Sequence, residues 1–163
     1  MDMKINSGEL LYKVRKESPV IHHITNWVTI YDCAQAVKSL GASPVMAHDP
    51  GEASDMANIA SALVLNIGTL TSDLIEAMVS AAKTANKNNI PVLLDACGVG
   101  ATRLRNNKSE KLLDKVRINI IKGNASEIAS LAGKDVSTRG VDASEVKDNL
   151  AGIARELALR NKS

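Results

Sequence analysis

Acidic and amide side chains follow two short apolar runs of this chain, at the points where those runs end. Asp95 directly follows the run 91–94, and Asn124 and Glu127 come shortly after the run 118–121. A carboxylate at the carboxyl end of a strand can bind Mg²⁺ or act as an orienting or basic group. The same residues also fit structural work, since Asn124 and Glu127 have the spacing of a capping box and Asp95 could cap its loop. Both interpretations stay open for each carboxylate.

Polar and glycine residues also end the three earlier apolar runs, which span Val20–Ile24, 44–47 and 62–67. In chain order they include His23, Thr25, Asn26, His48, Asn66, Gly68 and Thr69. Because ligands bind outside the carboxyl ends of the strands in an open α/β sheet, this distribution predicts a ligand site along one edge of one sheet. Neighbouring residues of a strand point to opposite faces, so His22 and His23 are not expected to share a transition metal.

Segments with helical periodicity alternate with the apolar runs. We expect helices at about 7–16, 25–40, 52–60, 72–87, 108–116, 124–131 and 142–159, with a loop over 96–107. The expected N-caps are Ser7, Ser72 and Asp142, while Thr25 or Asn26 opens the second helix and Gly41 ends it. This alternation predicts an α/β fold with a mostly parallel sheet and helices on both faces. The pattern Gly98-x-Gly100 is too short for a dinucleotide fingerprint, which disfavours a Rossmann-type cofactor domain.

Composition limits the kinds of partner. The chain has 163 residues, of which 45% are hydrophobic and 23% charged, and a net charge of +2, which fits one globular domain. With one Trp, two Tyr, no Phe and no dense basic run, it offers little to a nucleic acid. The two cysteines, Cys33 and Cys97, make no disulfide framework, and no stretch approaches membrane-spanning length. We therefore expect a cytoplasmic protein without nucleic-acid or membrane partners.

Four segments together resemble one known family. They are 23–26 (HITN), 40–48 (LGASPVMAH), 62–70 (ALVLNIGTL) and 123–128 (GNASEI). Each is weak alone, but their order and spacing closely resemble the hydroxyethylthiazole kinases of the ribokinase-like superfamily, over roughly residues 7–159. The resemblance implies a ribokinase-like α/β fold and transfer of the ATP γ-phosphoryl group to the hydroxyl of 4-methyl-5-(2-hydroxyethyl)thiazole, with Mg²⁺, in thiamine salvage.

The resemblance also implies an assembly and a substrate pocket. Members of the family form homotrimers in which each thiazole pocket lies between neighbouring subunits. By position, Asn26 and Met46 would line that pocket, and Gly68 and Thr69 would reach it from the adjacent subunit. The expected partners are therefore the thiazole alcohol, ATP and two further copies of the chain.

At the phosphate end, the resemblance assigns Asp95 and Glu127 to Mg²⁺ and the phosphates, and Asn124 to the Asn-x-x-Glu signature of the superfamily. Lys122 stands where the family usually has an Arg that contacts ATP. Lysine keeps the charge of that arginine but loses its bidentate fork. The pair Ala96-Cys97 replaces a usual Pro-Val.

Members of the family are considerably longer, and their later part carries a glycine-rich anion hole beside the residue that activates the hydroxyl. We therefore expect residues 1–163 to form a single ribokinase-like domain, incomplete at its carboxyl-terminal side after the fifth or sixth strand–helix unit. No catalytic residue is expected within them, and alone they should be inactive. Two alternatives remain: a non-catalytic thiazole-binding or assembly module, and a related ribokinase-like kinase for another small alcohol.

Overall fold

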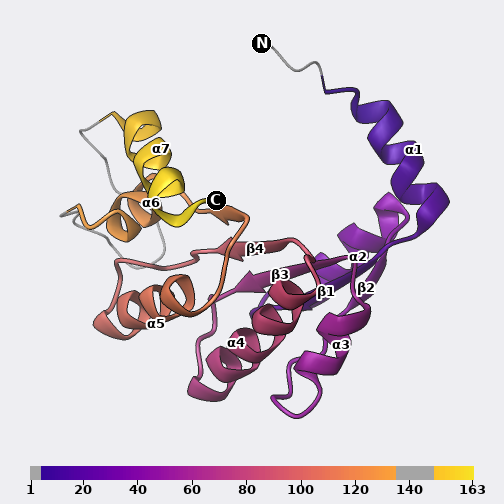
Figure 1. The fold of residues 1–163 in the computed structure, drawn as a ribbon, viewed down its shortest axis with the longest axis horizontal. Coiled ribbons are helices and arrows are strands. Elements are labelled where there is room, and N and C mark those ends of the chain that lie inside the picture. Colours follow the sequence, from indigo (N-terminus) through magenta and orange to yellow (C-terminus); the bar gives the residue numbers. More distant parts are fainter. Residues whose placement is uncertain (1–4, 135–148) are drawn as a thin grey trace.

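A computed structural model describes residues 5–134 and 149–163. Its centre is a sheet of five strands in the order β2-β1-β3-β4-β5, and every neighbouring pair is parallel (Figure 1). The strands are β1 Val20–Ile24, β2 Ser43–Val45, β3 Ala62–Asn66, β4 Val92–Asp95 and β5 Ile120–Lys122. All five strands expected from the apolar runs are present, and the predicted parallel α/β architecture is confirmed.

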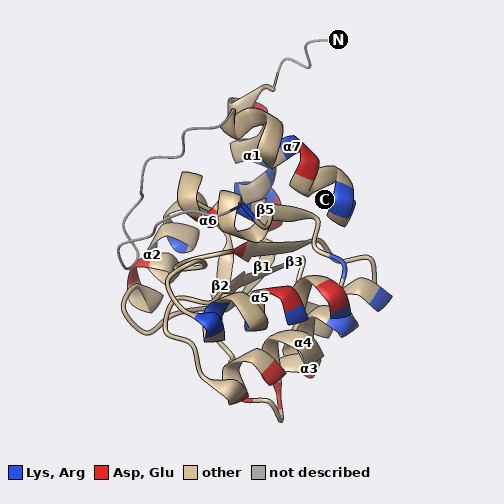
Figure 2. Cartoon of the chain, turned by 90° about the vertical axis from the view of Figure 1, so that its left-hand side faces the viewer, with Lys and Arg blue, Asp and Glu red and all other residues tan. Residues whose placement is uncertain are grey.

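Helices lie on both sides of this sheet. They are α1 Ser7–Glu17, α2 Ile30–Leu40, α3 Ala53–Ile59, α4 Ser72–Lys87, α5 Arg103–Lys115, α6 Ala125–Leu131 and α7 Leu150–Asn161. In both ribbon views α3, α4 and α5 lie below the sheet, while α1, α6 and α7 lie above it (Figures 1 and 2). Helix α2 packs beside β2, and α1 packs against α2. Among the described residues, every helix is too short or too polar to cross a membrane.

The main core lies between the sheet and the α3–α4–α5 layer. Alternate strand residues face this layer, among them Leu63, Leu65 and Leu94, and all three are fully buried. Helix α4 meets them with Ile75 and Met78. The buried alanines of α4 and α3 fill the remaining space in a chain that has no Phe. This layer supplies most of the hydrophobic burial that holds the strands in register.

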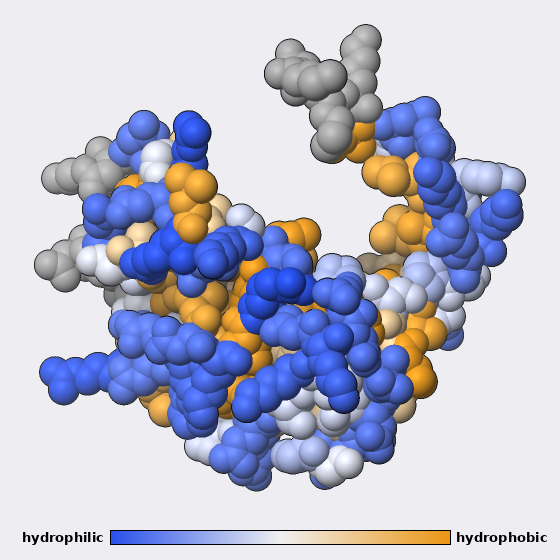
Figure 3. All heavy atoms as spheres, in the orientation of Figure 1, coloured by the Kyte–Doolittle hydropathy of each residue, from blue (hydrophilic) through white to orange (hydrophobic). Residues whose placement is uncertain are grey.

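The opposite face of the sheet is only partly covered. His23, Val64 and Leu93 are half-buried there, and Ile120 on the edge strand is 56% exposed. The pairing register places these four residues on one side, because His23 pairs with Val64, Val64 with Leu93, and Leu93 with Ile120. Figure 3 shows the molecule hollowed on this side, between α1 and the α6–α7 pair. This face of the sheet is therefore accessible between α1 and the α6–α7 pair.

Two expected helix starts are displaced because polar side chains close the preceding turns. Helix α2 begins at Ile30, not at Thr25 or Asn26, because the Asn26 side chain accepts hydrogen bonds from the N–H groups of Val28 and Thr29 and forms a separate turn. Helix α5 begins at Arg103, inside the expected loop 96–107, because Thr102 accepts from the N–H of Arg105 and caps the helix.

The N-caps also differ by one residue from those expected. Asn6 caps α1 in place of Ser7, and Thr71 caps α4 in place of Ser72. Gly41 ends α2 as predicted, with a φ of +94° that favours glycine. The expected cap Asp142 lies outside the described residues, and the described part of the last helix begins at Leu150.

Candidate functional site

Three polar side chains form a row across the carboxyl ends of the strands. Asn66 of β3, Asp95 of β4 and Lys122 of β5 are directly paired in the sheet register, so their side chains share the partly covered face. Asn66 Nδ2 donates to Asp95 Oδ2 at 2.9 Å. Lys122 Nζ lies 3.2 and 3.1 Å from the two carboxylate oxygens of Asp95. The row therefore joins an amide, a carboxylate and an ammonium by hydrogen bonds.

The same hydrogen-bonded network continues toward β1 through Asn26. Its Nδ2 donates to Asn66 Oδ1 at 3.1 Å and to Thr29 Oγ1 at 3.0 Å. The N–H of Gly68 also donates to Asn66 Oδ1, at 2.8 Å. A Cβ atom at Gly68 would lie 2.8 Å from the Cβ of Asn26 and from Asn66 Oδ1. Only glycine lets the β3–α4 loop approach Asn26 this closely.

The remaining candidate substrate residues lie beside this network. Thr69 Oγ1 accepts a hydrogen bond from the backbone N–H of Trp27 at 3.0 Å. The Trp27 ring meets His48 edge to face, with centroids 4.5 Å apart and an interplanar angle of 88°. His48 Nδ1 lies 3.1 Å from the carbonyl oxygen of Met46. Within one chain, Asn26, Gly68 and Thr69 are thus in one contact cluster, and Met46 joins it through His48 and Trp27.

Glu127 is held by two backbone N–H groups. Its Oε1 accepts from Gly98 at 2.8 Å and its Oε2 from Asn124 at 2.7 Å, and the residue is only 6% exposed. Asn124 Oδ1 accepts from the N–H of Glu127 at 3.0 Å, so the pair forms a capping box at the start of α6. The structural interpretation of these two residues is therefore confirmed, and Glu127 additionally ties α6 to the β4–α5 loop.

The charged groups at this edge of the sheet shift the pKa values of Lys122 and Cys97. The hydrogen bond to Asp95 raises the pKa of Lys122, and Glu127 adds to that shift. Burial raises the pKa of the Cys97 thiol, and the charges of Glu127 and Asp95 raise it further. Cys97 is therefore protonated at neutral pH and unsuited to act as a nucleophile.

In the part of the chain that the structure describes, neither the histidines nor the carboxylates form a cluster typical of a transition-metal site. His22 is fully buried, and its Nε2 lies 2.7 Å from the carbonyl oxygen of Ala47, whereas His23 faces the other side of the sheet. Burial lowers the pKa of both imidazoles. Across residues 5–134 and 149–163, no group of three or more His, Cys, Asp or Glu side chains is arranged to hold a metal ion.

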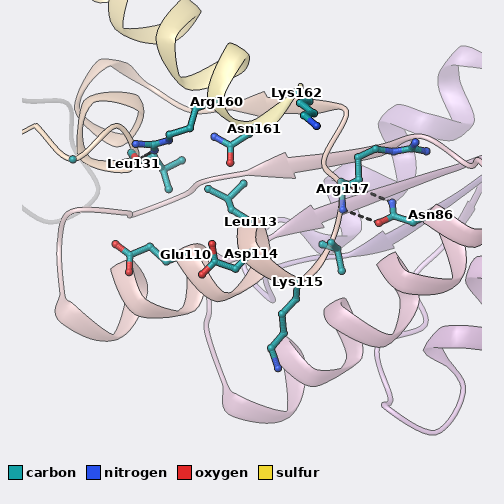
Figure 4. Close-up of a pocket in the computed structure, with 12 residues that line it drawn as sticks. Asn86, Glu110, Leu113, Asp114, Lys115, Arg117, Leu131, Arg160, Asn161 and Lys162 are labelled. Carbon is teal, nitrogen blue, oxygen red and sulfur yellow. Dashed lines mark hydrogen bonds between the residues drawn. The ribbon is translucent and has the colours of Figure 1, made fainter.

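A hollow of about 790 Å³ lies between α5 and α7, away from the polar network. Figure 4 shows that its lining joins elements to one another: Asn86 of α4 exchanges two hydrogen bonds with the backbone of Arg117, and Arg160 donates to the carbonyl of Leu131. It lies where α5, α6 and α7 end, at the opposite end of the parallel strands from the network. The chemistry-bearing residues expected from the sequence lie outside this hollow.

Two residues of the site are assigned no specific role in the sequence-based expectations. Asn66 is visible in the sequence only as a polar residue at a strand end, although it is the centre of the network. Arg105 falls within the stretch expected to be a loop, yet it contacts both loops that follow β3 and β4. The cap residue Thr102, followed by a helix-compatible run, is the sequence signal that could have placed Arg105 in the first turn of a helix.

A parallel α/β sheet with a polar network at the carboxyl ends of its central strands defines a class of domains that bind small ligands at that edge. The comparisons with known proteins give the family. The model of the hydroxyethylthiazole kinase family matches residues 11–163. The chain therefore belongs to the hydroxyethylthiazole kinase family.

Individual relatives agree. The chain is 54% identical over 153 residues to the hydroxyethylthiazole kinase of Methanosarcina mazei, a match that covers 94% of this chain and 59% of the relative. It is 50% identical over 150 residues to that of a Thermoanaerobacter species. The solved structure of a hydroxyethylthiazole kinase protein from Pyrococcus horikoshii matches with a TM-score of 0.73 and 43% identity, over 77% of this chain and 49% of that one. The chain thus spans less than two thirds of the length of these relatives.

Proposed function

We propose that the full-length protein transfers the γ-phosphoryl group of ATP to the hydroxyl of 4-methyl-5-(2-hydroxyethyl)thiazole, as a step of thiamine salvage. The observation that supports this is the continuous hydrogen-bonded network that runs from Asn26 through Asn66 and Asp95 to Lys122. In a member of this family, it connects the residues proposed for the alcohol with those proposed for the phosphates. Phosphoryl transfer depends mainly on holding these two partners in line and on neutralising charge.

The proposed alcohol site consists of Asn26, Met46, Gly68 and Thr69. Both ends of the Asn26 amide are engaged, because Oδ1 accepts from the Val28 and Thr29 N–H groups while Nδ2 donates to Asn66 and Thr29. Its side chain is therefore fixed before any ligand arrives. Gly68 has no side chain, so the loop presents its backbone to a bound ring. A rigid pocket of this kind loses little conformational entropy on binding.

The proposed phosphate end consists of Lys122, Asp95 and Asn124, with Glu127 behind them. Mg²⁺ commonly uses one or two carboxylates together with waters and substrate phosphates, so Asp95 fits as its main protein ligand. Glu127 would act indirectly, since both of its oxygens already accept backbone N–H groups. Lys122 Nζ, on a side chain that is 64% exposed, is free to move from Asp95 to a phosphate oxygen. Bound Mg²⁺ would neutralise negative charge on the phosphates.

The proposal includes a homotrimer with the pocket between subunits. Three large apolar side chains next to the network are strongly exposed in the single chain: Trp27 by 52%, Val28 by 80% and Tyr31 by 70%. Exposed apolar groups of this size are typical of protein–protein contacts. Gly68 and Thr69 already contact the segment that carries these side chains. A subunit contact through the exposed side chains would therefore bring the whole cluster to a neighbouring subunit.

The free thiols of Cys33 and Cys97 suit the cytoplasm, which we propose as the location of the protein.

We further propose that the anion hole and the group that activates the hydroxyl lie outside residues 1–163. The test is ATP-dependent phosphorylation of hydroxyethylthiazole by the full-length protein and by a fragment that ends at Ser163. Loss of even one oxyanion donor costs roughly 10²–10³ in rate, so the fragment should be slower by at least that factor. Comparable turnover by both would place the chemistry within this segment. Thiazole binding without transfer by the full-length protein would favour a binding module, and transfer to another alcohol would favour a related kinase.

A further inference from the structure

Arg105 bridges the two loops that follow β3 and β4. It lies in the first turn of α5, and its Nη1 donates to the carbonyl oxygens of Ile67 at 2.7 Å and Cys97 at 2.9 Å. Its Nη2 donates to the carbonyl oxygen of Gly68. One side chain thus bonds three backbone carbonyls, two in the β3–α4 loop and one in the β4–α5 loop. The two loops are fixed relative to each other through this guanidinium.

The surroundings accommodate a planar guanidinium at this position. Gly98 lies against it: a Cβ atom there would be 3.0 Å from Nη1 and 3.2 Å from Cζ and Nε of Arg105. Gly98 also has a φ of +75°, which favours glycine. Arginine carries five N–H donors in a fixed fork, whereas lysine offers a single ammonium on a flexible stem. Lysine at this position could reach one of the loops but could not reproduce the fork.

The loop that Arg105 holds also contacts Asn26 and Trp27. On its other side, Gly68 approaches the Asn26 side chain, and Thr69 Oγ1 accepts the Trp27 N–H. The loop is therefore clamped between α5 and the turn that precedes α2. Removal of the guanidinium would leave three carbonyls without this donor and release one side of the clamp.

We propose that Arg105 is a positioning residue for the alcohol substrate: it holds the Gly68–Thr69 loop against Asn26 and Trp27 of its own chain, and so fixes the loop that the proposed pocket between subunits uses to bind the alcohol. This inference rests on the proposed function for the identity of the alcohol. Arg105 acts through the loop backbone, and the loop in turn meets the ligand. Its loss should therefore weaken binding of the alcohol more than binding of ATP, because Lys122 and Asp95 keep their own contacts.

The experiment compares three variants of the full-length protein: Arg105→Met, Arg105→Lys and the matched control Arg103→Met. Arg103 is exposed and is the first residue of α5, two positions before Arg105 in the same turn. For both Arg105 variants, the KM for hydroxyethylthiazole should rise about tenfold or more, with a change in the KM for ATP of less than about twofold. The lysine variant should keep the melting temperature close to that of the wild type. The Arg103 variant should match the wild type in all three quantities.

A spectroscopic measurement separates this inference from the proposed function. Trp27 is the only Trp of these 163 residues, and the difference spectrum against a Trp27→Phe background isolates its fluorescence. A displaced Gly68–Thr69 loop should shift that emission in the Arg105 variants and not in the Arg103 control. If the wild type fails to phosphorylate the thiazole while the emission shifts, the proposed function is wrong and the positioning role stands. Wild-type emission and wild-type KM in a stably folded Arg105→Lys protein would overturn the role of Arg105.

Discussion

Glu127 provides the sharpest test of how this edge of the sheet is held together. Its two carboxylate oxygens accept the N–H groups of Gly98 and Asn124, and the residue is 6% exposed. Glu127→Gln keeps the size of the side chain but replaces one accepting oxygen with an NH₂ group. One of the two backbone N–H groups would then face another donor. The change therefore removes one charge-assisted hydrogen bond and leaves a buried donor unpaired.

The cost of Glu127→Gln follows from these two contacts. A hydrogen bond to a charged group contributes about 1.5–3 kcal/mol, and an unpaired buried polar group costs about 1–3 kcal/mol. Because the two effects overlap at one N–H group, we expect a loss of about 2–4 kcal/mol in the free energy of unfolding. Glu127→Ala removes both acceptors and should cost more than Glu127→Gln. The exposed Glu76 of α4 provides the matched control, and Glu76→Gln should change stability by less than about 0.5 kcal/mol.

The assay is urea unfolding of the full-length protein at pH 7, followed by circular dichroism, for Glu127→Gln, Glu127→Ala and Glu76→Gln. The measurements are made without Mg²⁺ and ATP, so that only the structural role of the carboxylate is sampled. Equal midpoints and slopes for Glu127→Gln and Glu76→Gln would refute the reasoning, because a buried carboxylate with two backbone donors cannot lose one acceptor without cost. If the series is repeated with Mg²⁺ and Glu127→Gln loses stability only there, Glu127 is instead a direct metal ligand.

Two further predictions concern pH and charge. Burial lowers the pKa of His22, so this imidazole binds a proton more tightly in the unfolded chain than in the folded one. The free energy of unfolding should therefore fall as the pH drops below the ordinary pKa of 6.5, by up to about 1.4 kcal/mol per pH unit. In acid unfolding, His22→Gln should show a shallower decline. The hydrogen bond to Asp95 raises the pKa of Lys122. The stabilisation that this ion pair gives to the fold is therefore present below pH 10.5 and is lost as the pH rises further. Since Lys122 is mostly exposed, urea unfolding of Lys122→Met should show a loss below about 1 kcal/mol, and the difference from the wild type should shrink in high salt.

The sheet could be predicted from the sequence because its physical signals are local. The run Ala62–Asn66 consists of four apolar residues and a polar end, and Gly68 follows two residues later. Strands buried on a parallel sheet read as short apolar runs, and the intervening helices carry their own caps and periodicity. For the same reason Asp95 and Asn66 could be placed at the ligand edge without a structure.

The contacts of Arg105 and the turn at Asn26 could not be predicted in this way. The bonds of Arg105 to Ile67 and Gly68 join residues 38 and 37 positions apart, and no local pattern encodes such a distance. Asn26 can cap a helix or close an isolated turn; in the structure its Oδ1 closes the turn, while its Nδ2 donates to Asn66, 40 residues away. Residues with two comparable local options are decided by tertiary contacts.

The orientation of both asparagine amides in the network follows from the single carboxylate of Asp95. An ionised carboxylate can only accept, so Asn66 must turn its Nδ2 toward Asp95. Asn66 Oδ1 is then left to accept from Gly68 and from Asn26 Nδ2, which in turn directs Asn26 Oδ1 toward the N–H groups before α2. Because a cation bound to Asp95 would leave it an acceptor, this orientation is the same with Lys122 or with Mg²⁺ beside the carboxylate. The proposed phosphate end can therefore exchange its cation without disturbing the proposed alcohol end.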